Sequence, residues 1–110
     1  MKVREIVKAT GGRLLSGDAN KEIDPSKIST DSRGITKGEF FIALKGDNFD
    51  GNGFVKDAFK KGAIGVIGSG EGLRPAGENK IVIRVKETTK ALQDIAAHHR
   101  GKFRILNLGL

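Results

Sequence analysis

The chain has 110 residues, which is enough for a single domain with one modest core. Its 37% hydrophobic and 30% charged residues are typical of a folded protein, and no apolar run reaches the roughly 18 residues of a membrane span. The absence of cysteine excludes disulfides, thiolate metal sites and a cysteine nucleophile. Lys and Arg outnumber Asp and Glu by 20 to 13, and the net charge of +7 favours a polyanionic partner such as a nucleic acid or a nucleotide phosphate.

The amino-terminal part of the chain predicts one short helix followed by two short strands. Val3, Ile6 and Val7 repeat at the spacing of a helix that buries one side, and the pair Gly11-Gly12 is a common way to end such a helix. Gly17-Asp18 and Asp24-Pro25 are typical turn sequences. The elements expected here are a helix over residues 2–9, a strand over residues 13–16 and a strand over residues 27–30.

The strongest predicted strand lies in the middle of the sequence. Residues 39–44 read EFFIAL, and this apolar, β-rich run predicts a central strand that is covered on both faces. A polar loop is expected over residues 46–53. It precedes a helix with apolar side chains at Phe54, Val55, Ala58 and Phe59, and then a buried strand over residues 63–67.

The last part of the chain predicts a loop, a strand and a helix. Residues 68–79 hold four glycines and a proline and are expected to form a mobile loop. A strand over residues 81–85 and a helix over residues 88–103 follow, with Thr88 or Thr89 as the cap of the helix. The alternation of strands and helices predicts an α/β domain with a mixed or parallel sheet.

Two sequence features resemble metal or phosphate sites but have simpler explanations. His98 and His99 are adjacent in the predicted helix, so their side chains point about 100° apart and do not easily share one metal. We expect one packed and one exposed histidine. The run GSGEG at residues 68–72 has the wrong glycine spacing for a dinucleotide fingerprint, and no ATP-binding G-x-x-x-x-G-K-[ST] motif occurs in the sequence.

Two polar segments suit either an ordinary turn or a bound ligand. Residues 29–34, STDSRG, are rich in short hydrogen-bonding side chains, and their composition alone favours a turn. Residues 46–51, GDNFDG, leave the strongest strand at its carboxyl end, where open α/β sheets bind ligands. Here Asn48 can read a pyrimidine edge and Phe49 can cover an aromatic ring, or Phe49 can simply belong to the core. Arg33 can bind a phosphate or brace Asp31.

The excess of basic residues is diffuse, so a small basic nucleic-acid-binding module is an alternative that the sequence does not favour. All six aromatic residues are phenylalanines, mostly inside apolar runs, whereas a platform for single strands needs exposed aromatic rings among the charges. The densest basic cluster lies toward the end of the chain and consists of Arg84, Lys86, Lys90, Arg100, Lys102 and Arg104.

The two polar segments occur together in an order that resembles the amino-terminal domain of the bacterial Mur ligases. The matching runs are TDSR at residues 30–33, KGEFFIALKG at 37–46, DGNGF at 50–54 and GA at 62–63. The opening helix and the later ALQDIA helix also fit. Asn52 stands where the family usually has a histidine, so a role for that histidine does not transfer.

The resemblance implies a fold and a binding site. The fold would be a small mixed β-sheet of about five strands packed with about three helices, as one domain over residues 1–110. In this family the first domain holds the UDP end of a UDP-MurNAc-peptide, the second binds ATP and the third binds the incoming amino acid or dipeptide. Neither catalytic nor metal-binding residues are implied here. The implied UDP-binding residues are Thr30, Ser32, Arg33, Asp47, Asn48 and Phe49.

Within the family the chain resembles the MurF type, with the MurE type as the alternative. Family members continue after the last helix into a phosphate loop, whereas this sequence closes with ILNLGL, so we expect a domain without ATP chemistry that is inactive alone. ATP and Mg²⁺ would serve only the parent ligase. The expected partners are UDP-MurNAc-tripeptide and the other domains of the same ligase, with no membrane. The chain is expected to be monomeric and, because no secretory signal is visible, cytoplasmic.

Overall fold

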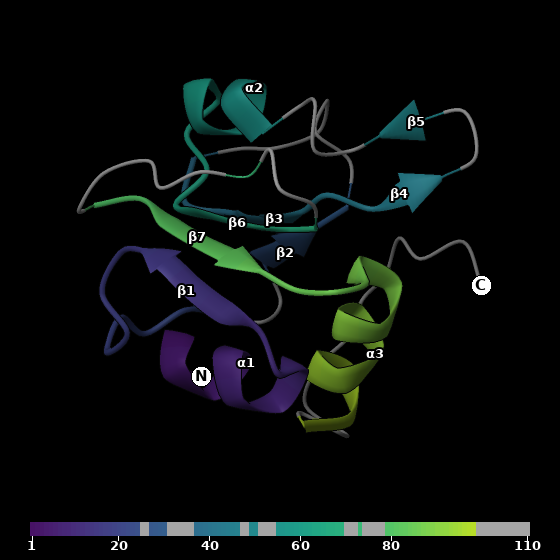
Figure 1. Ribbon diagram of the computed structural model, residues 1–110. Helices are drawn as coiled ribbons and strands as arrows, with labels where there is room; N and C mark the ends of the chain where they lie inside the picture. The colour runs from purple at the N-terminus through teal and green to yellow at the C-terminus, as the bar shows by residue number, and fades with distance from the viewer. Residues whose placement is uncertain are drawn as a thin grey trace.

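The chain folds into a mixed β-sheet with helices on both faces (Figure 1). The structure is a computed structural model, and it describes residues 1–24, 27–30, 37–46, 49–50, 55–69, 73 and 79–98. The predicted α/β class is therefore confirmed. The helices and strands are α1 (Val3–Thr10), β1 (Arg13–Ser16), β2 (Ile28–Ser29), β3 (Phe40–Ile42), β4 (Lys45–Gly46), β5 (Phe49–Asp50), α2 (Val55–Lys60), β6 (Gly65–Gly68), β7 (Ile81–Arg84) and α3 (Thr88–His98).

The main sheet has the strand order β1-β7-β6-β3-β2. Strands β2, β3, β6 and β7 run parallel, and β1 joins β7 in antiparallel orientation. The pairing of β1 with β7 contains a bulge between Leu14 and Ser16. Strand β3 is interior, as the sequence predicts, but β6 and not β3 occupies the middle of the sheet.

Strand β3 buries side chains on both faces of the sheet because alternate residues point to opposite sides. Phe40 and Ile42 belong to a large apolar cluster with α1 and α3, whereas Phe41 and Ala43 belong to a smaller cluster that includes Ala58 of α2. Figure 1 shows the corresponding layers, with α1 and α3 on one side of the sheet and α2 on the other. The continuously apolar run of β3 is explained by these two clusters.

The turn after α1 positions the edge strand β1. Gly11 ends α1 in the left-handed conformation, with φ +68°, as expected from the glycine pair. A Cβ at Gly12 would lie 2.9 Å from the carbonyl oxygen of Arg84 and 2.9 Å from Cγ1 of Val85. Gly12 thus lets the chain pass close to the end of β7 before β1 begins.

Two sequence predictions about local structure were wrong. The expected loop over residues 46–53 contains strand β5 and overlaps strand β4. These two strands pair with each other as a two-stranded antiparallel sheet beyond β3. Helix α3 is capped by neither Thr88 nor Thr89. The helix starts at Thr88, and the carboxylate of Glu87 accepts a hydrogen bond of 3.1 Å from the Thr89 N–H. Glutamate is an unusual cap, which is why the threonines were favoured by sequence.

Other predictions fall partly outside the described residues. The expected loop over residues 68–79 is described only at its ends and at Leu73, which is buried. The last helix is described to His98 and not to residue 103. His98 is exposed, as expected for one of the two histidines, and His99 lies outside the described residues.

Candidate functional site

The parallel strands end at one common edge of the sheet. The amide of Ala43, just beyond β3, donates a hydrogen bond of 2.8 Å to the carbonyl of Ile67 in β6. Beyond β7, the Val85 amide donates one of 2.9 Å to the Gly68 carbonyl. These bonds tie together the carboxyl ends of three strands, so residues that follow them start from a rigid edge. In open α/β sheets this edge is the usual ligand site.

The two polar segments singled out in the sequence both leave this edge. Thr30 directly follows β2 and is half-buried. Strands β2 and β3 are adjacent and parallel, with Ser29 opposite Phe41, so Thr30 lies beside the exit of β3. That exit leads into β4, which pairs with β5 at the right of Figure 1.

Of the six predicted UDP-binding residues, only two fall within the described part of the chain. Thr30 is placed at the common edge, and the backbone of Phe49 forms β5, paired with Gly46. The side chain of Phe49 lies outside the description. So do the remaining predicted residues, which are Ser32, Arg33, Asp47 and Asn48. The convergence of these side chains on one ligand therefore stays a prediction.

Two arginines face each other near the same edge. Arg13 of β1 is directly opposite Arg84, the last residue of β7, so the two side chains point to the same face of the sheet. Among the described residues, no hydrogen bond or ion pair neutralises either guanidinium. Within the described part of the chain, this end of β7 therefore carries two positive charges without a neutralising partner.

The basic cluster toward the end of the chain is less uniform than its sequence indicates. Lys90 forms an ion pair of 3.1 Å with Asp94, one helical turn further along α3. Lys86 is exposed, whereas Arg84 is only partly exposed. The other basic residues of that cluster, Arg100, Lys102 and Arg104, lie outside the described residues.

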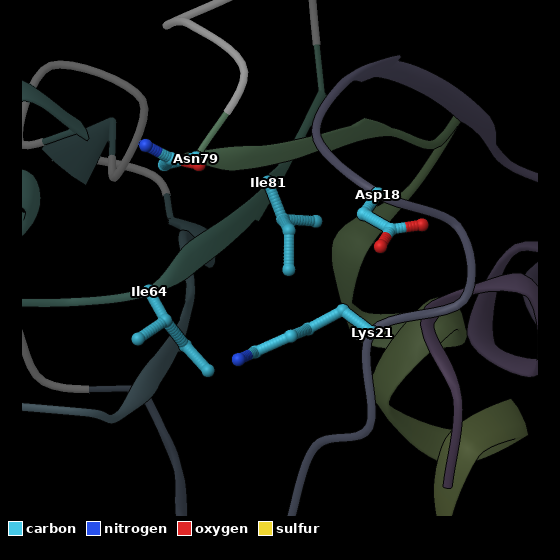
Figure 2. A pocket seen from close by; sticks show the side chains of 5 residues that line it. All are labelled: Asp18, Lys21, Ile64, Asn79 and Ile81. Atoms are coloured by element: carbon cyan, nitrogen blue, oxygen red, sulfur yellow. The ribbon is translucent and has the colours of Figure 1, made fainter.

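A cavity of about 400 Å³ opens at the opposite edge of the sheet, near the starts of β6 and β7 (Figure 2). Sequence reasoning missed this cavity because it forms only when the turn after β1 folds beside β7. The turn signal Gly17-Asp18 was visible in the sequence, but the pairing of β1 with β7 was not. The described residues that line the cavity are Asp18, Lys21, Ile64, Asn79 and Ile81.

Neither a metal centre nor a membrane span is found within the described ranges. No group of three or more His, Cys, Asp or Glu side chains there could hold a metal ion. No helix in the same part of the chain is both long and apolar enough to cross a membrane.

Comparison with known proteins identifies the family. The model of the Mur ligase family, catalytic domain, matches residues 25–100. A UDP-N-acetylmuramoyl-tripeptide–D-alanyl-D-alanine ligase of Synechocystis is 38% identical over 91 residues, which cover 83% of this chain and 20% of the relative. A UDP-N-acetylmuramoyl-L-alanyl-D-glutamate–2,6-diaminopimelate ligase of Clostridium tetani is 37% identical over 103 residues, covering 92% of this chain and 21% of the relative.

Solved structures agree with the sequence comparison. A crystal structure of MurF from Acinetobacter baumannii superposes with a TM-score of 0.69 at 28% identity, covering 89% of this chain and 20% of that chain. The five-stranded mixed sheet and three helices thus have the fold expected for the amino-terminal domain of a Mur ligase. The chain spans about a fifth of the length of these relatives. By sequence and by fold, this chain belongs to the Mur ligase family.

Proposed function

We propose that this chain is the UDP-substrate-binding domain of a MurF-type ligase of peptidoglycan precursor synthesis. Its ligand would be the uridine diphosphate end of UDP-MurNAc-tripeptide. The observation that carries the proposal is the adjacent, parallel arrangement of β2 and β3, which starts both matching sequence segments from one edge of the sheet. The family membership supports a UDP-MurNAc-peptide as the ligand.

The proposed contacts divide by chemistry. Thr30 and Ser32 would hydrogen-bond the nucleoside, and Asn48 would read the uracil edge because a carboxamide offers both a donor and an acceptor. Phe49 would cover the base, Asp47 would complete the loop around it, and Arg33 would face the phosphates or brace the loop.

Ligation itself would require parts that these 110 residues do not encode. The sequence holds no G-x-x-x-x-G-K-[ST] phosphate loop, so ATP and Mg²⁺ would act in other domains of the ligase, and the isolated chain would form no amide bond. Those domains and the UDP-MurNAc-peptide would be its partners. We further propose a cytoplasmic, monomeric domain, without a nucleic-acid or membrane partner.

A MurE-type ligase is the second candidate. It is supported by the similarity to the diaminopimelate ligase of Clostridium tetani, whose 37% identity nearly equals the 38% of the Synechocystis ligase. The names of both relatives specify a UDP-N-acetylmuramoyl peptide. A uridine site on this domain would serve either type, because the peptide would extend away from it.

A titration of the ¹⁵N-labelled chain with UDP, followed by amide chemical shifts, tests the proposal. We expect saturable shifts at Thr30, Asn48 and Phe49, and weaker binding by the Asn48→Ala variant. Gln93→Ala, an exposed polar residue on α3, is the matched control and should bind UDP like the parent chain. UDP-MurNAc-dipeptide and UDP-MurNAc-tripeptide should bind alike.

Two results would contradict this function. Saturable shifts that leave these amides still while others move would place the nucleotide elsewhere. Binding that is as strong for a random oligonucleotide as for UDP, and that falls steeply with salt, would indicate a general polyanion site.

A further inference from the structure

The cavity at the far edge of the sheet is not part of the proposed uridine site. It lies beside Ile64, just before β6, and Ile81, the first residue of β7, whereas the uridine site would lie beyond the other ends of the parallel strands. Its volume of about 400 Å³ is within the usual range of pockets for small ligands. Figure 2 shows Ile81 in the middle of the group, with Lys21 and Ile64 on one side of it and Asn79 on the other.

The rim of this cavity is held in place by backbone contacts. Gly17 has φ +98°, and a Cβ there would lie 2.7 Å from Cγ1 of Ile81, so the turn is pressed against β7. The Lys21 amide donates to the Asp18 carbonyl at 3.1 Å, and the amide of Val3 at the start of α1 donates to the Lys21 carbonyl at 3.0 Å. The backbone that carries Asp18 and Lys21 is thus fixed before any ligand arrives, which lowers the entropy cost of binding.

The floor of the cavity is apolar and equally well held. Ile81 is 3% exposed, and Ile64 is half-buried. The Ile64 amide donates to the Glu39 carbonyl at 2.8 Å, and the Ile81 amide donates to the Ile64 carbonyl at 3.1 Å. A ligand with an aliphatic part would remove the exposed surface of Ile64 from water.

The polar groups around the floor define the chemistry of a ligand. Figure 2 shows the side chain of Lys21 extending across the cavity toward Ile64. Within the described residues, neither the Lys21 ammonium nor the Asn79 carboxamide has a hydrogen-bond partner or ion pair. One ammonium and one amide suit a carboxylate, whereas a phosphate group is normally held by several donors at once. Asp18 at the rim disfavours a second negative charge.

We propose that this cavity binds a small aliphatic monocarboxylate. The carboxylate pairs with the Lys21 ammonium, the aliphatic part lies on Ile64 and Ile81, and Asn79 hydrogen-bonds polar atoms that extend beyond Ile81. Both a free amino acid and the carboxyl end of a peptide have this chemistry.

Amide chemical shifts of the ¹⁵N-labelled 110-residue chain test this site with N-acetyl-L-leucine as the probe. We expect saturable shifts at Asp18, Lys21, Ile64 and Ile81. N-acetyl-L-leucinamide, in which a neutral carboxamide replaces the carboxylate, should bind about threefold to fivefold more weakly, as expected for one ion pair at the protein surface. Free leucine and Gly-Gly-Leu, compared at equal concentration, identify which source of the carboxylate binds more tightly.

Two variants separate the proposed contact from a general effect of charge. Lys21→Met keeps the aliphatic stem and should weaken binding of N-acetyl-L-leucine by the same factor. Lys8→Met removes an exposed lysine on α1 and should leave binding unchanged. Equal binding of the carboxylate and the carboxamide, equal binding by Lys21→Met and the parent chain, or shifts that do not saturate would each overturn the proposal. None of these results bears on UDP binding, which is monitored at Thr30 and Asn48.

Discussion

The close contact between Gly65 and Phe40 predicts a strongly coupled pair of substitutions. Phe40 of β3 lies directly opposite Gly65 of β6, and a Cβ at Gly65 would touch the ring. The nearest atom would be Cε2, followed by Cζ at 2.8 Å and Cδ2 at 2.9 Å. Carbon atoms normally pack about 3.5–4.0 Å apart. The ring would have to move, and at 1% exposure it cannot turn toward solvent.

The magnitude follows from two opposing effects of Gly65→Ala. Overpacking a close-packed core costs about 1–3 kcal/mol. The φ angle of Gly65 is not in the left-handed region, so alanine can adopt this backbone conformation without strain. Alanine also reduces the conformational entropy of the unfolded chain, which stabilises the folded state by about 0.4–1 kcal/mol. We therefore expect a net loss of about 1–2 kcal/mol in the free energy of unfolding. For a domain of this size the midpoint of thermal unfolding should fall by about 4–8 °C.

A double-mutant cycle measured by urea unfolding checks the cause of this loss. Phe40→Leu removes Cε2 and Cζ, two of the three crowded ring atoms, and leaves a cavity of its own. In the Phe40→Leu background, Gly65→Ala should cost nothing or stabilise slightly, which gives a favourable coupling energy of about 1–2 kcal/mol. Additive losses in the double variant, or a Gly65→Ala variant as stable as the parent chain, would refute the packing explanation.

Two further predictions concern the glycine turns and the arginine pair. Gly17→Ala should destabilise the chain by at least about 1 kcal/mol more than Gly38→Ala, because both glycines have left-handed φ angles of +98° and +89° but only Gly17 is pressed against Ile81. Equal losses in chemical denaturation would show that backbone strain alone matters. Arg13→Glu should raise the free energy of unfolding by about 0.5 kcal/mol at low salt, because it replaces a like-charge pair with Arg84 by an opposite-charge pair. The gain should disappear at high salt, and a gain that persists there would contradict an electrostatic origin.

Local sequence patterns were sufficient to predict most of the main sheet and its helices. The predicted strand at residues 13–16 matches β1, and the glycine pair after α1 marks its end correctly. These features depend on neighbouring residues only. The strand order could not be predicted, because the placement of β6 between β3 and β7 depends on contacts between segments far apart in the chain.

The candidate site was predictable only in part, for related reasons. The TDSR segment could be recognised from its residues, and its position beside the exit of β3 follows from the parallel pairing of β2 and β3. The β4–β5 pairing escaped prediction because each strand has only two residues, and one of the two, Gly46 in β4 and Asp50 in β5, is of a type that is depleted in strands. The far cavity escaped because Lys21 and Asn79 are 58 positions apart in the chain and only the fold brings them to one space.

The bulge in β1 has a consequence for how this sheet meets other molecules. A long, flat edge strand exposes a row of unpaired backbone groups that can recruit a strand from a neighbouring chain. Strand β1 has four residues, begins with an arginine and changes register between Leu14 and Ser16, and strand β2 at the opposite edge has two residues. Within the described residues, both borders are therefore poor templates for strand addition, which disfavours edge-to-edge aggregation of this sheet.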